Sequence, residues 1–282
     1  MLKVVYIAGM SRSGSTILEM FMATHPQMVS VGESLHSIMA ERATQHTPED
    51  NWPCSCGHSR QECEFWGPLL PQLRDGSLTD AFELVVARFQ EFYPGMIFVD
   101  SSKELRSLEL FYLPLARRGL IDLRAVHIVR DMRAWASSVT ARRRKWGEKT
   151  HYVVEAYRWL WSTLQALRFL KRNRIPTMMV SHEDFTSDSE RYAALLARFL
   201  DVDNGFAEEK LTRARAHELY GSPHLKFDPQ RRSRIVYDST WVHDWRPFAY
   251  GPLTIPPLVM NYRLQNVIRR NHVDIERGAA AG

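Results

Sequence analysis

The sequence contains few cysteines, no long apolar run and little excess charge. Only three of the 282 residues are cysteine, and all three fall between residues 54 and 63, which excludes a disulfide framework across the chain. No window of eighteen apolar residues occurs, so no membrane-spanning helix is expected. A net charge of +5 favours anionic ligands but is too small to indicate a nucleic-acid partner.

The sequence also shows no internal repeat and no low-complexity segment. An apolar, strand-like run begins at Leu2, which leaves no room for a signal peptide or anchor, and we therefore expect a cytoplasmic protein. A length of 282 residues with 45% hydrophobic and 24% charged residues is typical of one large globular domain. We accordingly interpret residues 1–282 as a single domain.

The three cysteines lie in one loop-like stretch. Cys54, Cys56 and Cys63, together with His58, offer three thiolates and an imidazole, the donor types that zinc prefers. Their spacing is tighter than in common structural zinc sites, so we favour free thiols packed in a tryptophan-containing loop and expect no metal. A zinc site and a labile disulfide are the alternatives.

Strand-like and helix-like segments alternate along the chain. Short apolar runs predict strands over residues 2–8, 96–99, 123–129 and 177–181. Helical patterns cover residues 17–23, 78–93, 104–118, 132–145, 152–173, 188–201 and 254–270, and Ser77 to Asp80 resembles a capping box that opens the second of these helices. This alternation predicts an α/β fold of the three-layer, P-loop-like kind, with a central parallel sheet and helices on both faces. Residues 34–77 are interpreted as a cysteine-containing insertion and residues 275–282 as a frayed tail.

A glycine- and serine-rich turn, Gly9 to Thr16, joins the first strand to the first helix. Backbone N–H groups of such a turn and of the helix start converge on one point, where the helix dipole adds positive charge. The context therefore predicts an anion-binding loop. The alternative is a tight turn without a ligand, which the crowding of one arginine and several hydroxyl groups into the turn disfavours.

The loop differs from the Walker A motif of nucleotide triphosphatases. Gly9 and Gly14 have the Walker spacing, but Ser15 stands where the lysine is required, and the nearest cation is Arg12. A small-molecule kinase with this loop would lack the lysine that contacts the β- and γ-phosphates of ATP. The sequence therefore favours an anion other than a magnesium-bound triphosphate.

A second candidate anion site follows the third predicted strand. Arg130 stands at the end of that strand, and Ser138 lies two turns into the next helix. An arginine and a hydroxyl group so placed are suited to bind a second phosphate. The alternative for Arg130 is an ion pair with Asp131 or another surface carboxylate. Because ligands bind at the carboxyl ends of parallel strands, we expect both clusters at that edge of the sheet.

Together these residues resemble the sulfotransferase family, whose members use 3′-phosphoadenosine 5′-phosphosulfate (PAPS). The match to the family's 5′-phosphosulfate loop consists of Ser11, Arg12, Ser13, Gly14, Ser15 and Thr16, with arginine where many members have lysine. Arg130 and Ser138 match the family's 3′-phosphate motif. Further segments resemble a bacterial branch, namely 54–66, 100–103, Gly221-Ser-Pro223 and Asp238 to Trp241.

The resemblance also implies catalytic roles. Gly32-Glu33 is similar to a motif of the tyrosylprotein branch of the family, in which the glutamate is the general base. In this chain His36 is the alternative candidate for the base. Steroid- and phenol-type members instead have a histidine base after their second principal strand, where this chain has Asp100-Ser101-Ser102-Lys103. Lys103, and Ser102 beside it, would contact the sulfuryl oxygens. The family's late Arg-Lys-Gly motif is absent, and the candidates to replace it are Lys226, Arg231, Arg232 and Arg234.

The expected reaction is transfer of a sulfuryl group from PAPS to an acceptor hydroxyl or an amine, leaving adenosine 3′,5′-bisphosphate. In this hypothesis Glu33 accepts the proton, Arg12 and the loop amides stabilise the leaving phosphate, and no metal is required. The acceptor is a small molecule, a glycan or a lipid, with no nucleic acid involved, and the sequence leaves the oligomeric state open. The alternatives are a P-loop kinase and a non-catalytic nucleotide-binding protein.

Overall fold

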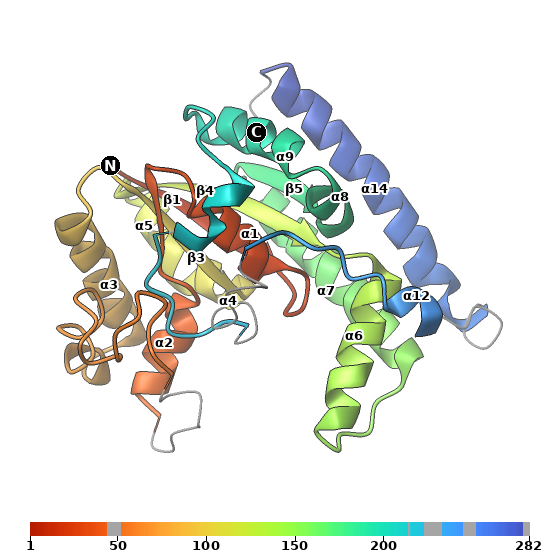
Figure 1. Ribbon diagram of the computed structural model, residues 1–282, viewed down its shortest axis with the longest axis horizontal. Helices are drawn as coiled ribbons and strands as arrows, with labels where there is room; N and C mark the ends of the chain where they lie inside the picture. Colours follow the sequence, from red (N-terminus) through yellow and green to blue (C-terminus); the bar gives the residue numbers. More distant parts are fainter. Residues whose placement is uncertain (44–51, 214, 223–232, 245–251, 279–282) are drawn as a thin grey trace. The chain divides into compact units, whose positions relative to one another are not determined.

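The computed structural model describes residues 1–43, 52–213, 215–222, 233–244 and 252–278 (Figure 1). Contacts between residues divide the chain into two compact units. Unit 1 comprises Met1–Ala8, Thr16–Ala125 and Asn204–Ile235, and unit 2 comprises Gly9–Ser15, Val126–Asp203 and Val236–Gly282. The two units are described separately below.

Five strands form one all-parallel sheet in the order β2-β3-β1-β4-β5. Their bounds are β1 (Leu2–Gly9), β2 (Met28–Ser30), β3 (Ile97–Lys103), β4 (Ile121–Val129) and β5 (Thr177–Ser181). β1 is buried along nearly its whole length, as expected for a parallel strand covered on both faces. The sheet and the helices around it confirm the predicted α/β class, and β2 is a strand that the sequence analysis did not assign.

In unit 1 the helices are α1 (Ser15–Met22), α2 (Ser34–Glu41), α3 (Leu78–Phe92), α4 (Leu105–Ser107) and α5 (Leu113–Arg117). Short 3-10 turns occur at Gln72–Arg74 and Glu208–Arg213. α3 begins with the capping box that the sequence suggests, in which Ser77 and Asp80 each accept a hydrogen bond from the other's backbone N–H. Its buried face includes Phe82, Val85 and Phe89.

The helix expected over residues 104–118 is interrupted. A π-helical turn, Leu108–Tyr112, separates α4 from α5. Pro114 contributes to this because it has no N–H to donate to the preceding turn. The turn also places the Tyr112 hydroxyl against the buried carboxylate of Asp100. Residues 105–117 are nevertheless helical throughout, so the predicted helix is confirmed, and the π-helical turn within it is the feature that the sequence did not indicate.

Two further expectations in unit 1 were wrong in detail. The strand expected over 96–99 continues to Lys103, because the polar residues at its end have buried hydrogen-bond partners and need not face water. Within the predicted insertion 34–77, residues 34–41 form α2, whose first turn is tied to β3 by the hydrogen bond from the Leu35 N–H to Ser102 Oγ. Residues 44–51 of the insertion lie outside the described residues.

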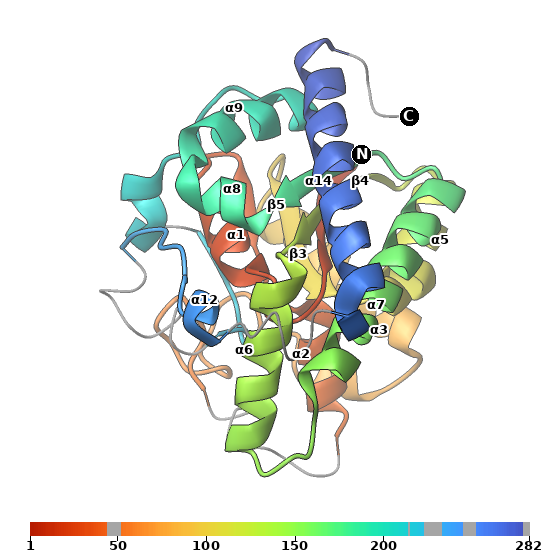
Figure 2. The ribbon, with the colours of Figure 1, turned by 90° about the vertical axis from the view of Figure 1, so that its right-hand side faces the viewer.

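The helices described in unit 2 are α6 (Met132–Lys145), α7 (Tyr152–Arg172), α8 (His182–Ser187), α9 (Ser189–Leu200), α12 (Trp241–Asp244) and α14 (Ile255–Glu276). A 3-10 turn over Pro252–Thr254 precedes α14. Trp135, Trp159, Leu264 and Ile268 belong to one buried cluster formed by α6, α7 and α14. Figure 2 shows α14 running past α9 and β5, with which it is in contact.

α14 ends later than expected. It continues through residues 271–276, because Ile275 is buried and the Arg198 side chain donates a hydrogen bond to the Glu276 carbonyl oxygen. The prediction of a frayed tail over 275–282 was therefore wrong for residues 275 and 276. Residues 279–282 lie outside the described part of the chain. α8 was not predicted either; its six residues follow β5 directly and are capped by Ser181.

Candidate functional site

The loop after β1 has a backbone conformation that few residues adopt. Arg12 has φ +74° and Gly14 has φ +90°, and the Ser13 N–H donates to the Met10 carbonyl at 3.1 Å to close a tight turn. A Cβ atom at Gly14 would lie 2.1 Å from Cδ2 of His182, so only glycine fits at this position. The sequence motif thus corresponds to a loop with a specific conformation, held against the start of α8.

Unit 2 brings together three residues that the sequence analysis assigned to phosphate binding. The Arg12 guanidinium donates to Ser138 Oγ from Nε at 3.1 Å and from Nη2 at 3.0 Å. Nη1 of Arg130 donates to the carbonyl oxygen of Arg12 at 3.2 Å. Residues separated by more than a hundred positions in the sequence therefore converge on the loop, as expected for one binding site.

The positive charge in this cluster is concentrated. The pKa of Arg12 is lowered by burial of the guanidinium and then by the neighbouring cations of Arg142 and Arg130. An electrostatic cost of this kind is relieved when an anion binds. The environment of Arg12 is therefore suited to a phosphate or sulfate group.

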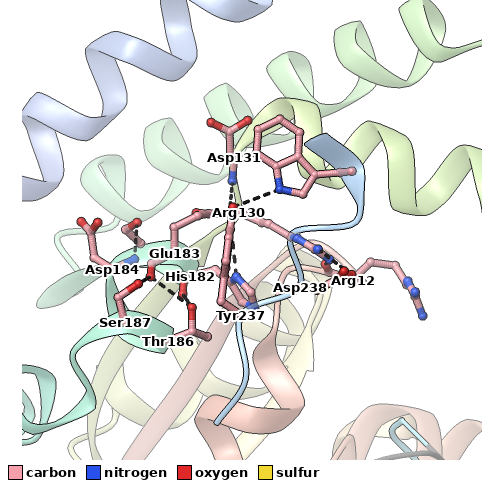
Figure 3. Close-up of polar contacts among 12 residues, drawn as sticks. Arg12, Arg130, Asp131, His182, Glu183, Asp184, Thr186, Ser187, Tyr237 and Asp238 are labelled. Carbon is pink, nitrogen blue, oxygen red and sulfur yellow. Dashed lines mark hydrogen bonds and ion pairs between the residues drawn. The ribbon is translucent and has the colours of Figure 1, made fainter. Parts of the chain in front are cut away.

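Arg130 is 6% exposed. Among the described residues it forms one ion pair, with Asp238 (Figure 3). Its Nη2 atom lies 3.3 Å from a carboxylate oxygen of Asp238. Asp131 pairs instead with Arg133 at 2.9 Å and caps α6, so the ion pair of Arg130 with Asp131 is not the one formed. The buried Nε of Arg130 has no hydrogen-bond partner within the described residues, which leaves a donor for a ligand oxygen.

Two tryptophans fix the backbone of this site. Trp135 on α6 donates from its indole N–H to the Ser11 carbonyl at 2.8 Å. Trp159 on α7 donates to the Arg130 carbonyl at 3.1 Å. Both indoles are buried. They connect the core of unit 2 to the two segments that hold the candidate anion-binding residues.

Unit 1 holds the candidate base. Glu33 lies immediately before α2 and forms an ion pair with Nζ of Lys103 at the end of β3. Lys103 adopts a left-handed conformation with φ +65°, next to a register shift between β1 and β3. The Glu33 side chain is 21% exposed and the Lys103 side chain is 11% exposed, so both remain partly accessible. Roles for both residues, and their proximity at the carboxyl ends of the strands, were expected from the sequence, but the direct ion pair between them was not.

The rest of the Asp100 to Lys103 segment has structural partners. Asp100 accepts hydrogen bonds from Ser34, Tyr112 and the Ser102 backbone, and Ser102 Oγ accepts from the Leu35 N–H at 3.1 Å. Ser102, which was considered for sulfuryl binding, thus links β3 to α2. His36, the rival base, is exposed on α2 and stacks on the Tyr220 ring at 4.1 Å.

A buried carboxyl group lies beneath this segment. Glu19 on α1 accepts hydrogen bonds from Ser101 at 2.5 Å and from Ser30. Burial, followed by the nearby carboxylate of Glu218, raises the pKa of Glu19 well above its ordinary value. The buried environment of Glu19 therefore favours the protonated carboxyl group, a feature that the sequence did not indicate.

Of the four basic residues considered as replacements for the late Arg-Lys-Gly motif, one lies within the described part of the chain. Lys226, Arg231 and Arg232 lie outside the described residues, and Arg234 is exposed. Asp238, the partner of Arg130, was not assigned a role from sequence, although it begins the Asp-x-x-Trp segment noted there. Trp241 of the same segment lies under the Arg133 guanidinium at 4.9 Å.

The cysteines are grouped differently from the sequence expectation. Cys54, Cys56 and Cys63 lie close to His217, with all four candidate donor atoms within 4.8 Å of one another. His217 was missed because it lies more than 150 residues further along the chain. His58, the histidine considered from sequence, is exposed and is not part of this group.

Comparison with known proteins identifies the class of this chain. The model of the sulfotransferase family matches residues 5–208. This match covers well over half of the sequence, and the chain therefore belongs to the sulfotransferase family. No curated protein matches it in a sequence search.

Two solved structures share the fold. The sulfotransferase domain from the curacin biosynthetic pathway is 22% identical, with a TM-score of 0.63 and coverage of 94% of this chain and 98% of that one. The sulfotransferase domain from the Synechococcus PCC 7002 olefin synthase is 20% identical, with a TM-score of 0.54 and coverage of 92% and 94%. Within the described residues, no helix combines the length and apolar character needed to cross a membrane.

Proposed function

We propose that this protein is a PAPS-dependent sulfotransferase that transfers a sulfuryl group to an acceptor hydroxyl. The observation that carries the proposal is the convergence of Arg12, Arg130 and Ser138 on the glycine loop of unit 2. A nucleotide with phosphates at both the 5′ and the 3′ positions requires two anion-binding groups. The loop and the Arg130–Ser138 pair provide them.

In this proposal the residues of the loop bind the 5′-phosphosulfate. Backbone N–H groups of Gly14 and Ser15, at the start of α1, would donate to the anion, and Arg12 would neutralise charge on the phosphate oxygen that leaves. Arg130 and Ser138 hold the 3′-phosphate, with the unpartnered Nε of Arg130 as one donor. PAPS supplies an activated sulfuryl group, whose low charge allows fixed cations to suffice without magnesium.

Glu33 is proposed as the general base. A carboxylate accepts the acceptor's proton as the oxygen attacks sulfur. Lys103, paired with Glu33, orients the carboxylate and provides a cation for the sulfuryl oxygens. Because the pair is partly exposed, an acceptor can reach it without unfolding of the segment.

The proposal is tested by transfer of label. The protein is incubated with radiolabelled PAPS and a metabolite extract, and the labelled product identifies the acceptor. With that acceptor, Glu33→Gln is expected to lower turnover by about 100-fold or more, because the amide cannot accept a proton. Glu209→Gln, at an exposed carboxylate of a 3-10 turn, serves as the matched control and should retain turnover.

Three results would contradict the proposal. Absence of label transfer to any component of a broad acceptor panel would leave a nucleotide-binding protein without transferase activity. Normal turnover of Glu33→Gln would assign the proton to His36 or another group. Magnesium-dependent ATP consumption would instead support the kinase alternative.

A further inference from the structure

We propose that Cys54, Cys56, Cys63 and His217 form a structural zinc site. The inference is independent of the sulfotransfer proposal, because none of these residues is assigned to the donor or the acceptor. It begins from the composition of the group: three thiols and one imidazole, a donor set found in structural zinc sites.

The distances between the donor atoms suit one tetrahedral ion. Sγ of Cys63 lies 3.2 Å from Nδ1 of His217 and 3.6 Å from Sγ of Cys54, and the Cys54–His217 separation is 3.9 Å. In a tetrahedral site with zinc–sulfur distances of about 2.3 Å and zinc–nitrogen distances of about 2.0 Å, ligand atoms are about 3.5–3.8 Å apart. The three separations among Cys54, Cys63 and His217 are close to that geometry, and Sγ of Cys56 lies within 4.8 Å of each of these atoms.

The surroundings of the histidine fix the nitrogen that would bind the ion. Nδ1 of His217 faces the sulfur atoms, whereas Nε2 is hydrogen-bonded to the Tyr93 hydroxyl. A histidine that binds a metal through one nitrogen usually donates its other N–H to a neighbouring oxygen. Tyr93 therefore occupies the place of an outer partner that orients the ring.

The surroundings of the cysteines are also suited to thiolates. The Trp66 backbone N–H donates to Sγ of Cys63 at 3.5 Å. Gly57 follows Cys56 with φ +92°, and its N–H donates to the Cys54 carbonyl at 2.9 Å, which closes a tight turn around the first two ligands. Cys54 and Cys63 are buried, and none of the three cysteines forms a disulfide.

The site would connect two distant segments of unit 1. The loop containing the cysteines also contacts the segment of His217: the Glu218 N–H donates to Ser55 Oγ at 2.8 Å, and the Ser55 N–H donates to the Glu218 carbonyl oxygen at 3.0 Å. The neighbouring residue Ala216 forms a bridge with Ser30 of β2. Four protein ligands leave no open position, so the ion would stabilise the fold instead of taking part in catalysis.

The test begins with the metal content of the full-length protein, expressed in zinc-containing medium and dialysed against metal-free buffer. We expect about one zinc ion per chain. Cys63→Ser should lose the ion, because it removes a buried ligand. His58→Ala is the matched control: it removes an exposed histidine of the same loop that lies outside the ligand group, and it should retain the zinc.

A second measurement does not depend on the folding of a variant. The wild-type protein is stripped with a chelator and titrated with cobalt(II), which should produce the thiolate charge-transfer and tetrahedral d–d absorption bands of a sulfur-rich site. Stripping should also lower the melting temperature, and zinc should restore it. Zinc-free protein whose three thiols all react with a thiol reagent in the folded state would overturn the proposal, and so would a Cys54–Cys63 disulfide.

Discussion

Individual side chains in unit 1 show which polar groups are structural and which remain available. Asp100, Ser101 and Ser102 are buried and are used in hydrogen bonds, whereas Glu33 and Lys103 are partly exposed and paired only with each other among the contacts described above. A reactive carboxylate needs access to its substrate, and buried groups of the same segment lack it. This difference favours Glu33 as the residue for proton transfer.

The buried carboxyl group of Glu19 makes the stability of the protein dependent on pH. Its pKa in the folded protein is raised, chiefly by burial, above the value of about 4.3 expected in the unfolded chain. The folded state therefore retains a proton that the unfolded state releases, and stability is lost as pH rises above the unfolded pKa and towards the folded one. The loss is at most about 1.4 kcal/mol per pH unit.

We expect Glu19→Gln to remove this dependence, because the amide stays neutral and keeps an oxygen for Ser101 and Ser30. The free energy of unfolding of the wild type should fall relative to that of the variant as the pH rises above about 4.3, the pKa of the unfolded chain. Chemical denaturation at several pH values measures the difference, with Glu209→Gln as the control. Parallel curves for wild type and Glu19→Gln would contradict protonation of Glu19 in the folded state.

At the scale of secondary structure, the sequence predicts elements best where the pattern is local. The bounds of β5 and α6, and the capping box of α3, agree with the sequence because apolar runs and cap residues are themselves local signals. The extension of β3 and the π-helical turn before α5 could not be predicted. Both depend on hydrogen bonds between residues that are distant in sequence or on buried polar groups such as Asp100.

The loop between β1 and α1 depends on Gly14 in two ways, through its positive φ and through the close approach of His182. Gly14→Ala is therefore expected to lower stability by about 1–3 kcal/mol and to abolish binding of adenosine 3′,5′-bisphosphate. Gly119→Ala is the matched control, because Gly119 has φ +68° but no atom within 4 Å of the added Cβ.

Thermal unfolding and a binding titration distinguish these effects. Gly119→Ala should lose about 1 kcal/mol, from backbone strain alone, and bind the nucleotide normally. The double variant Gly14→Ala/His182→Ala should recover part of the lost stability, since the clash with the ring is removed. Normal nucleotide binding by Gly14→Ala would show that the conformation of the loop is not required.

For the whole molecule, the family match and the parallel sheet agree with what the residue pattern and the stated resemblance predicted. The convergence of Arg12, Arg130 and Ser138 was also predicted, because a parallel sheet brings the ends of its strands to one edge. Asp238 and His217 were not assigned from sequence. Each is a single residue far along the chain from its partners, and no local pattern indicates such a contact.

The central claim is that Arg130 and the glycine loop bind the nucleotide. Calorimetric titration with adenosine 3′,5′-bisphosphate, the spent donor, tests it most directly, using wild type, Arg130→Ala and the exposed control Arg144→Ala on α6. We expect saturable binding by wild type and Arg144→Ala, and a loss of about tenfold or more in affinity for Arg130→Ala, as charged hydrogen bonds are removed. Equal affinity of all three proteins, or no binding by wild type, would contradict the account.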